Sequence, residues 1–135
     1  MARGGDTIEI TYNHPTLGTG AFFPKAGEAA TVDLGGIRSA DEAAGVDGAG
    51  NAIAQLSRVR WSYEVACAND MNGREDIVKA KQLAGSPEPA TWTFANINGV
   101  IYTGTGWPVG DIQSDDFAAT FTLKVSGGGE LQKIS

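Results

Sequence analysis

The sequence has very few of the residues that build metal sites and disulfides. It contains one cysteine and one histidine among 135 residues. A single cysteine excludes an internal disulfide, and one cysteine with one histidine cannot supply the usual ligand set of a structural zinc site. The acidic residues between positions 35 and 57 lack the ligand spacing of a calcium loop. We therefore expect neither a metal nor a cofactor.

Positive charge and long apolar runs are also scarce. Ten basic residues stand against 16 acidic ones, which leaves a formal net charge of −6. An acidic chain repels phosphate backbones, so a nucleic-acid reader is a poor first hypothesis. No stretch approaches the roughly 18 apolar residues of a membrane span, and the first residues lack a signal-peptide core. We expect a protein without membrane anchoring, kept in a cytoplasm-like compartment or carried inside an assembled particle.

Glycine, by contrast, is abundant. The chain has 19 glycines and only five prolines, which is not the composition of a linker. Abundant glycine in a folded chain indicates many turns, and many turns indicate many short strands. The length suits one domain with one core, and no linker divides it. The sequence therefore predicts a single domain over residues 1–135.

Strict alternation of apolar and polar residues predicts strands at residues 7–12, 58–67 and 117–125. A period of two over such lengths indicates strands with one buried face. Residues 91–97 and 100–104 flank Asn98-Gly99, which is the strongest local signal for a β-hairpin. Residues 130–134 can add a short terminal strand. The predicted apolar faces are Ile8, Ile10 and Tyr12; Val59, Trp61, Tyr63, Val65 and Cys67; and Phe117, Ala119, Phe121, Leu123 and Val125.

Residues 72–84 carry the one helical pattern. Asn72 is a suitable N-cap, with Glu75 at the third position, and Gly85 ends the helix. The apolar stripe is narrow and built of small residues, so the helix is expected to lean on a sheet. The predicted fold class is mainly β: an antiparallel sandwich or barrel with one flanking α-helix.

A long segment at about residues 35–57 does not fit this compact body. It is rich in Gly, Ala and Asp and has few large side chains to bury. It can form a long hairpin around Asp47-Gly48 or two irregular arms. So long a connection without its own core usually serves a function, and a partner that orders it offsets its entropy cost. We predict an arm that contacts other subunits, with candidate interface residues Arg38, Asp41, Val46, Asp47, Asn51 and Ile53.

Trp107 is the remaining interface candidate. It lies between Gly106 and Pro108 in a stretch, residues 104–111, that resembles a glycine-punctuated turn region. A tryptophan displayed on a loop is a typical interface anchor. Trp61 and Trp92 lie in predicted strands, so we assign them to the core.

No catalytic constellation is apparent. Gly104-Thr105-Gly106 lacks the third glycine and the helix start of a nucleotide fingerprint, and no P-loop lysine follows. His14 has no nominated partner for acid–base work and is interpreted as a surface turn residue. Cys67 falls on an apolar strand face, where a buried inert thiol is the default. We predict that the protein is not an enzyme and name no catalytic, cofactor-binding or metal residue.

The C-terminal third carries a recognisable succession of motifs. It runs through Ile97-Asn98-Gly99-Val100, Gly104-Thr105-Gly106 and Pro108-Val109-Gly110-Asp111, and ends with Phe121-Thr122-Leu123-Lys124 and Gly127-Gly128-Gly129. This succession resembles the tail tube proteins of long-tailed bacteriophages, especially small ones from contractile tails. The strand-rich start, the long loop and the single mid-chain helix are similar too.

The resemblance implies a virion structural protein that works by self-assembly. Subunits of that family form hexameric rings in which inner sheets join into one barrel around a lumen, and the rings stack into a tube. The implied partners are other copies of the chain and the sheath, baseplate and tape-measure proteins. The genome passes through the lumen during ejection without specific binding. The implied location is the virion tail, assembled in the bacterial host cytoplasm; tailocin and type VI secretion tubes use related subunits.

Three other hypotheses stay open at this stage. Another structural virion component, such as a baseplate or capsid-decoration protein, would need the same kind of β domain. A monomeric β-sandwich that binds sugars or peptides would show an aromatic-lined groove. An enzyme is the weakest hypothesis because the sequence nominates no reactive group.

Overall fold

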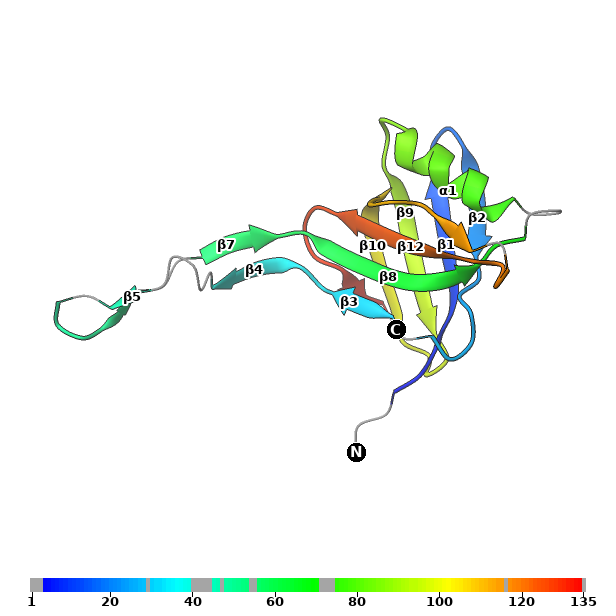
Figure 1. Ribbon diagram of the computed structural model, residues 1–135. Helices are drawn as coiled ribbons and strands as arrows, with labels where there is room; N and C mark the ends of the chain where they lie inside the picture. Colours follow the sequence, from blue (N-terminus) through cyan, green and yellow to red (C-terminus); the bar gives the residue numbers. More distant parts are fainter. Residues whose placement is uncertain are drawn as a thin grey trace.

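The computed structural model describes residues 4–28, 30–39, 45–46, 48–53, 56–70, 75–115 and 117–134. Strands dominate, and one helix follows the eighth strand (Figure 1). The elements are β1 (Thr7–His14), β2 (Gly18–Phe22), β3 (Thr31–Asp33), β4 (Gly36–Ser39), β5 (Gly45–Val46), β6 (Ala52–Ile53), β7 (Leu56–Val59), β8 (Trp61–Ala68), α1 (Asp76–Gly85), β9 (Ala90–Asn96), β10 (Ile101–Pro108), β11 (Ser114–Asp115), β12 (Thr120–Gly127) and β13 (Gln132–Lys133).

One bent antiparallel sheet forms the body. Its strand order is β2-β1-β9-β10-β12-β8-β3, with β13 beside β10 and β11 beside β12. The first part of β10 pairs with β9, whereas Trp107 and Pro108 at its end pair with β12. The sheet therefore turns at β10 into two halves that face each other, and β8 and β12 run across β1 and β9 (Figure 1). The predicted mainly β, antiparallel class with one helix is confirmed.

The sheet does not close into a barrel within the described residues. Its terminal strands, β2 and β3, each pair with one neighbour. The chain directly after β2 does reach β8: Pro24 forms a bridge with Cys67, and two backbone hydrogen bonds flank it, from the Lys25 amide to the Ala66 carbonyl at 2.9 Å and from the Ala68 amide to the Phe23 carbonyl at 2.8 Å. The part of the fold prediction that proposed a barrel therefore does not apply to one subunit.

The core lies between the two halves and is largely aromatic. The predicted inner faces of β8 and β12 are confirmed, because every second residue from Trp61 to Cys67 and from Phe121 to Val125 is buried. Tyr63 stacks on Phe94 with ring centroids 4.1 Å apart. The Trp92 Nε1–H donates to the Gly106 carbonyl at 3.0 Å, which satisfies a buried donor. Trp61 and Trp92 are core residues, as predicted.

Strand β1 departs from the predicted alternation at its first residues. Its pairing with β9 shifts register between Thr7 and Glu9, which is a β-bulge. The bulge turns Ile8 outward, where it is 51% exposed, and buries Thr7. The Thr7 hydroxyl then hydrogen-bonds the Tyr63 hydroxyl inside the core. The assignment of Ile8 to the inner face was wrong because the sequence pattern carries no sign of the bulge.

The predicted turn region over residues 104–111 is mostly strand. Gly104 and Gly106 lie inside β10. A β-carbon at position 104 would lie 2.8 Å from Leu131 Cδ2, and one at position 106 would lie 2.3 Å from the Ser126 carbonyl oxygen. These glycines therefore permit a close approach of backbones rather than a turn.

The Asn98-Gly99 hairpin is confirmed between β9 and β10. Gly99 has a φ of 88°, and the Asn96 amide donates to the Val100 carbonyl at 2.9 Å. The third predicted strand begins later than expected. Residues 117–119 form a turn before β12, and Phe117 is fully exposed instead of buried. A β11–β12 hairpin that the alternation does not reveal accounts for this difference.

The helix is shorter than predicted. It begins at Asp76; the proposed cap Asn72 lies outside the described residues, and Glu75 is left-handed with a φ of 52° and no side-chain cap. Ala80 and Leu83 are buried, and α1 packs against β10 as a flanking helix. Asp76 is buried in the first turn, where its Oδ2 accepts the Asp70 amide at 2.9 Å.

Candidate subunit interface

The segment after β3 leaves the body as a two-stranded arm. β4 pairs with β7 in the register Gly36↔Val59 to Ser39↔Leu56, and further out Gly45↔Ile53 and Val46↔Ala52 pair in β5 and β6. The arm extends far beyond the core to one side (Figure 1). The structure thus decides for a hairpin between the two alternatives that the sequence left open.

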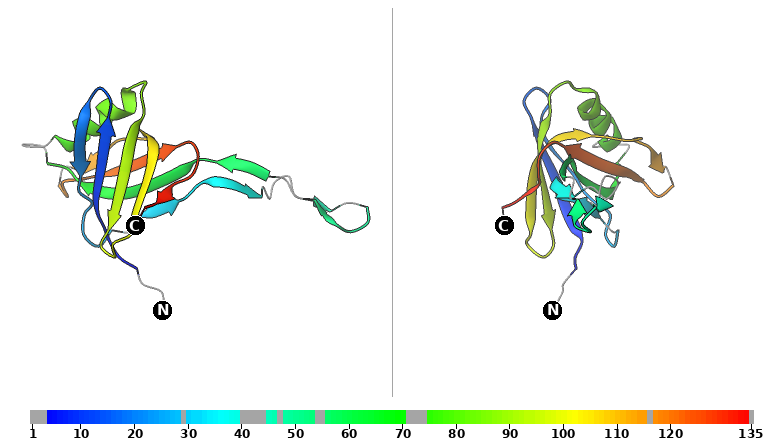
Figure 2. Two further views of the ribbon diagram at one scale, coloured as in Figure 1. Left: turned by 180° about the vertical axis from the view of Figure 1, so that it is seen from behind. Right: turned by 90° about the vertical axis from the view of Figure 1, so that its left-hand side faces the viewer.

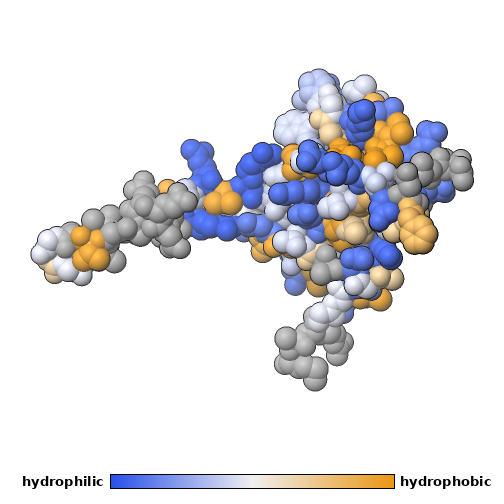
Figure 3. All heavy atoms as spheres, in the orientation of Figure 1, coloured by the Kyte–Doolittle hydropathy of each residue, from blue (hydrophilic) through white to orange (hydrophobic). Residues whose placement is uncertain are grey.

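The arm displays apolar side chains that the body does not cover. Ile37 and Leu56 lie on the same face of the β4–β7 ribbon, since Ile37 pairs with Arg58 and Leu56 is two residues before it. They are 72% and 67% exposed, and Val46 further out is 69% exposed. Figure 3 shows hydrophobic patches along the arm among hydrophilic residues. Apolar residues exposed on a protruding ribbon are typical of a contact surface.

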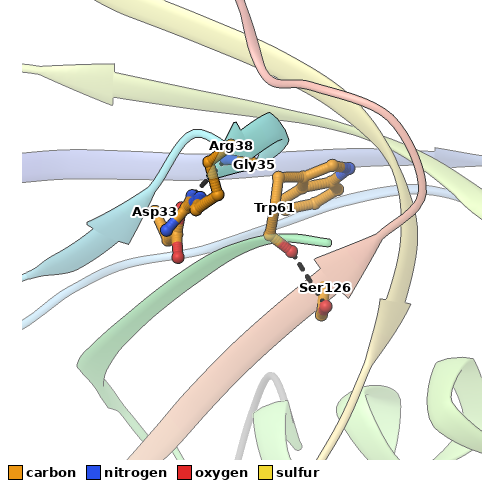
Figure 4. A network of polar contacts seen from close by, with 5 residues as sticks. All are labelled: Asp33, Gly35, Arg38, Trp61 and Ser126. Carbon is orange, nitrogen blue, oxygen red and sulfur yellow. Dashed lines mark hydrogen bonds and ion pairs between the residues drawn. The ribbon is translucent and has the colours of Figure 1, made fainter. Parts of the chain in front are cut away.

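The root of the arm is held firmly to the body. The Arg38 guanidinium binds the Asp33 carboxylate, and this hydrogen bond lowers the pKa of Asp33 (Figure 4). The Leu131 amide donates to the Leu34 carbonyl at 2.9 Å. At the start of β8, the Ser126 hydroxyl donates to the Trp61 carbonyl at 2.8 Å. The first two contacts tie the start of the arm to the body.

The structure places the candidate interface residues at different points along the arm. Arg38 is bound to Asp33 at the root, and Val46 and Asn51 are exposed near the far end. Ile53 belongs to β6, opposite Gly45. Asp41 and Asp47 lie outside the described residues. Their role at an interface stays a prediction.

Trp107 is not on a loop. It lies in β10, is half-buried, and donates its Nε1–H to the Ser86 carbonyl at 3.0 Å. Ser86 directly follows α1, so Trp107 ties the end of the helix to the sheet within the subunit. The placement of Trp107 on a loop was therefore wrong, whereas its role at a subunit interface stays a prediction.

An unprotected strand edge lies at one end of the sheet. Within the described residues, β2 pairs with β1 alone. Its sequence, Gly-Thr-Gly-Ala-Phe, has no charge and no proline. Proteins usually block exposed edges with charges, prolines or bulges, because an open edge pairs readily with another strand. β2 is therefore a candidate site for strand pairing between subunits.

The outer face of the β2-β1-β9-β10 half is covered by hydroxyl groups. Figure 2, left, shows these strands nearest the viewer with the helix behind them. Cross-strand partners share a face, and those next to the buried Ile10, Tyr12, Trp92 and Phe94 point outward. Two rows of this face are Thr11–Thr93–Thr103 and Asn13–Thr91–Thr105. We call these six residues the threonine face; none of them is charged. The neighbouring row, Glu9–Ala95–Ile101, lies on the same side of the sheet and adds one carboxylate.

His14 is buried, so its interpretation as a surface turn residue was wrong. Its Nδ1 accepts the amides of Thr16 and Leu17 at 3.0 and 2.9 Å. The proton therefore sits on Nε2, which lies 2.9 Å from the Ser86 hydroxyl and 3.0 Å from the Glu88 carbonyl. This side chain joins the β1–β2 turn to the end of the helix.

Replacing His14 by alanine is expected to lower the free energy of unfolding by about 2 kcal/mol, because buried amides and a carbonyl lose their partner. His14→Asn keeps an acceptor near the Nδ1 position, so its free energy of unfolding is expected to fall by less. Urea unfolding of both variants measures the difference. Identical midpoints for His14→Ala and the unchanged protein would contradict this role.

The one cysteine, Cys67, is shielded from reaction. Cys67 is fully buried, and burial raises its pKa to about 12, with a further contribution from Asp76. The thiol is therefore protonated at neutral pH. Among the residues described, no three His, Cys, Asp or Glu side chains gather as a metal site would require. In the same part of the chain, no helix has the length and apolar character to cross a membrane.

Two features escaped the sequence analysis. The open edge of β2 appears only when the strand order is known, because residues 18–22 show no alternation. The exposed Phe117 was hidden in an apolar pattern that continues smoothly into β12. Asp115, whose Oδ1 accepts the Phe117 and Ala118 amides at 3.0 and 3.2 Å, was the one local signal of a turn.

No protein-family model matches this chain, and no curated protein matches it. Among solved structures, it is similar to a chain in the cryo-EM structure of the anti-feeding prophage (AFP) baseplate, 6-fold symmetrised. The two share 10% sequence identity at a TM-score of 0.43, over 100% of this chain and 97% of that one.

Proposed function

We propose that this chain is a self-assembling structural subunit of a phage-type tail tube and has no catalytic role. The observation that carries the proposal is the open, unprotected edge of β2 at the end of a bent sheet that does not close on itself. An uncharged edge of this kind promotes aggregation of a monomer, whereas in an assembly it can pair with a strand of the next subunit. Pairing between unlike edges of successive copies produces a ring when the rotation closes.

The threonine face suits the inner wall of such a ring. Six subunits, as the family resemblance implies, would place their β2-β1-β9-β10 halves side by side around a lumen. The two rows of hydroxyl and amide groups carry no charge, so they would offer a DNA backbone no ionic attachment. The genome would then pass without specific binding.

The arm would make the second kind of contact. Its exposed Ile37, Leu56 and Val46 extend away from the sheet that would form the ring. They would therefore meet a neighbouring subunit or the next ring. The sheath, baseplate and tape-measure proteins would be the other partners. The proposed setting is the virion tail, assembled in the bacterial host cytoplasm.

The alternative hypotheses predict different particles. A baseplate or capsid-decoration protein would form a limited oligomer without tubes. A monomeric binding module would need an accessible aromatic platform. A hollow of about 290 Å³ does include Tyr63 and Tyr102, but Tyr63 is buried and stacked on Phe94. That ring therefore presents no open face to a sugar.

The double substitution Thr19→Lys/Ala21→Lys tests the open edge. Two lysines on the outer side of β2 are expected to prevent pairing between subunits and to leave a folded monomer. Thr91→Lys/Thr93→Lys is the matched control, because it adds the same two charges to the same face in the interior strand β9. Analytical ultracentrifugation and negative-stain micrographs over a concentration series measure the result.

The expected outcome is a monomer for the edge variant and rings or tubes for the control and the unchanged protein. Normal tubes from the edge variant would refute the role of β2. An unchanged protein that stays monomeric at every concentration would refute the proposed function.

A further inference from the structure

The turn between β9 and β10 forms a firm apolar tip at one end of the body (Figure 1). Ile97 is 62% exposed in this turn, and its amide donates to the Asp6 carbonyl at 2.8 Å. The Asn96 side-chain amide donates to the Gly5 carbonyl at 3.0 Å. A β-carbon at position 5 would lie 2.7 Å from Ile97 Cγ2, so the segment before β1 lies directly against the turn. We call Ile97 and Asn98 the Ile97 tip.

A groove of about 550 Å³ lies at the other end of the body, between the β1–β2 turn and the end of α1. Figure 1 shows both of these elements at the top, with the β9–β10 turn at the bottom. Leu17, which is 45% exposed, and Pro87 give the groove apolar walls. Lys81 and Gln82 line it from the helix. We call this feature the α1-end groove.

The groove is held open by contacts between segments that are far apart in sequence. The Nε2–H of the buried His14 donates to the Ser86 hydroxyl and the Glu88 carbonyl. The Thr16 hydroxyl donates to Glu88 Oε2 at 3.0 Å, and Trp107 donates to the Ser86 carbonyl. The walls are therefore fixed before anything binds, which removes the cost of ordering them.

The tip and the groove lie at opposite ends of the same strands. β9 runs from Ala90, three residues after Pro87 in the groove, to Asn96, next to the tip, and β1 runs antiparallel beside it. The eight residues of β1 separate the two ends by roughly 25 Å. Pairing at the β2 edge adds copies across these strands. A copy displaced along the strands instead brings a tip to a groove.

We propose that the Ile97 tip of one copy inserts into the α1-end groove of a second copy in the adjacent ring, so that rings stack along the direction of β1 and β9. The occupant of the groove is a second copy of this chain. Because the tip and the groove differ, each copy uses one of them on either side, and the contact repeats without closing. This inference rests on the proposed tube function and gives its rings a stacking contact in addition to the arm.

Charge favours the same arrangement. Lys81 is exposed at the groove and forms no ion pair within the described residues. Glu88, which also lines the groove, already accepts a threonine hydroxyl. At the other end, Asp6 is bonded through its backbone to Ile97. Insertion of the tip brings the Asp6 carboxylate toward the Lys81 ammonium, and opposite charges beside an apolar contact set its direction.

Ile97→Ser tests the apolar part of the contact, with Ile97→Leu as the matched control. The serine variant is expected to raise the concentration needed for stacking by about tenfold or more, because a buried aliphatic side chain contributes that much to an association constant. Single rings joined through β2 should persist. The leucine variant keeps an apolar side chain of similar volume and should stack like the unchanged protein. Negative-stain micrographs and sedimentation velocity over a concentration series distinguish single rings from tubes.

Charge reversal tests the ionic part. Lys81→Glu and Asp6→Lys are each expected to raise the stacking concentration by about tenfold, because like charges then meet. The double variant Asp6→Lys/Lys81→Glu should restore stacking. Lys79→Glu is the control for Lys81→Glu, since residues two apart lie on opposite sides of a helix. Lys79→Glu should stack normally, and its combination with Asp6→Lys should not restore stacking.

A cross-link tests which surfaces meet. Asn98→Cys at the tip is mixed with Gln82→Cys at the groove under oxidation, and Cys67 does not compete because it is buried. The expected product is a disulfide between unlike variants, formed in tubes and absent from single rings. Disulfides between two Asn98→Cys copies would mean that like ends meet and would contradict the proposal.

The remaining outcomes separate this contact from the proposed function. Normal stacking of Ile97→Ser, an equal defect in Ile97→Leu, or no rescue by the double charge reversal would overturn the contact between tip and groove while leaving ring formation intact. Rings of the unchanged protein that never stack would also overturn it. Failure of the unchanged protein to form any ring or polymer would overturn the proposed function and this contact together.

Discussion

Gly127→Ala is expected to destabilise the fold by about 3 kcal/mol, because the added methyl group has no space. A β-carbon at position 127 would lie 1.9 Å from the Thr105 carbonyl oxygen and 2.8 Å from Trp61 Nε1. Gly127 is the end of β12, where that strand crosses β10 and pairs with Trp61. The obstacle is backbone, so the junction between the two halves of the sheet must open to accept the methyl group.

Gly128→Ala is the matched control for this substitution. Gly128 is the next residue, and a β-carbon there meets nothing within 4 Å. The midpoints of thermal and urea unfolding should therefore be much lower for Gly127→Ala than for Gly128→Ala. The midpoints of Gly128→Ala should be close to those of the unchanged protein. Equal stability of the two variants would mean that the crossing of β10 and β12 is not as close as the structure describes.

Replacing residues 40–52 by a short Gly-Ser turn is expected to abolish tubes and leave the body folded. The β4–β7 pairs at the root and the inner faces of β8 and β12 remain in this variant. The removed segment lies outside the core of the body, so the free energy of unfolding should change by no more than about 0.5 kcal/mol. Electron micrographs and urea unfolding of the same preparation measure both effects.

Ala49→Ser is the control for the shortened arm. It keeps the length of the arm and changes one side chain in the turn at residues 48–50. It should assemble like the unchanged protein. Tubes of normal length from the shortened variant would show that the arm is dispensable for stacking, whereas unfolding of that variant would show that the body depends on it.

The shape of the subunit favours assembly between unlike surfaces. The β2 edge and the arm lie on different sides of the body (Figure 1), and neither has an equivalent copy related by symmetry within the chain. Surfaces of this kind make heterologous contacts, which generate rings and stacks instead of closed pairs. The proposed tube needs two such contacts, one sideways through β2 and one through the arm.

Local patterns were sufficient where local rules decide the structure. The alternation around Tyr63 and Leu123 predicted buried strand faces, because a β-strand places every second side chain on one side. Asn98-Gly99 predicted its hairpin, because a tight turn needs a residue with positive φ. The same patterns failed at Ile8 and Phe117, because a bulge and an extra hairpin interrupt the alternation without changing the residue types.

The candidate interface was predicted in outline and missed in its details. Composition located the arm at about residues 35–57, since a segment poor in large apolar residues cannot join the core. Trp107 was taken for a surface anchor because Gly106 and Pro108 flank it, whereas the crossing of β10 and β12 requires that glycine for close approach. His14 was placed on the surface because its partners Ser86 and Glu88 are more than 70 residues away in sequence.

The sequence by itself therefore determined the mainly β class, the single helix, the aromatic core faces and the presence of an arm. Each of these depends on residue period or composition within a short window. Only the tertiary structure decided the strand order, the open edge of β2, the threonine face, the burial of His14 and the exposure of Phe117. These features depend on which distant strands become neighbours, and that is settled by packing the whole core at once.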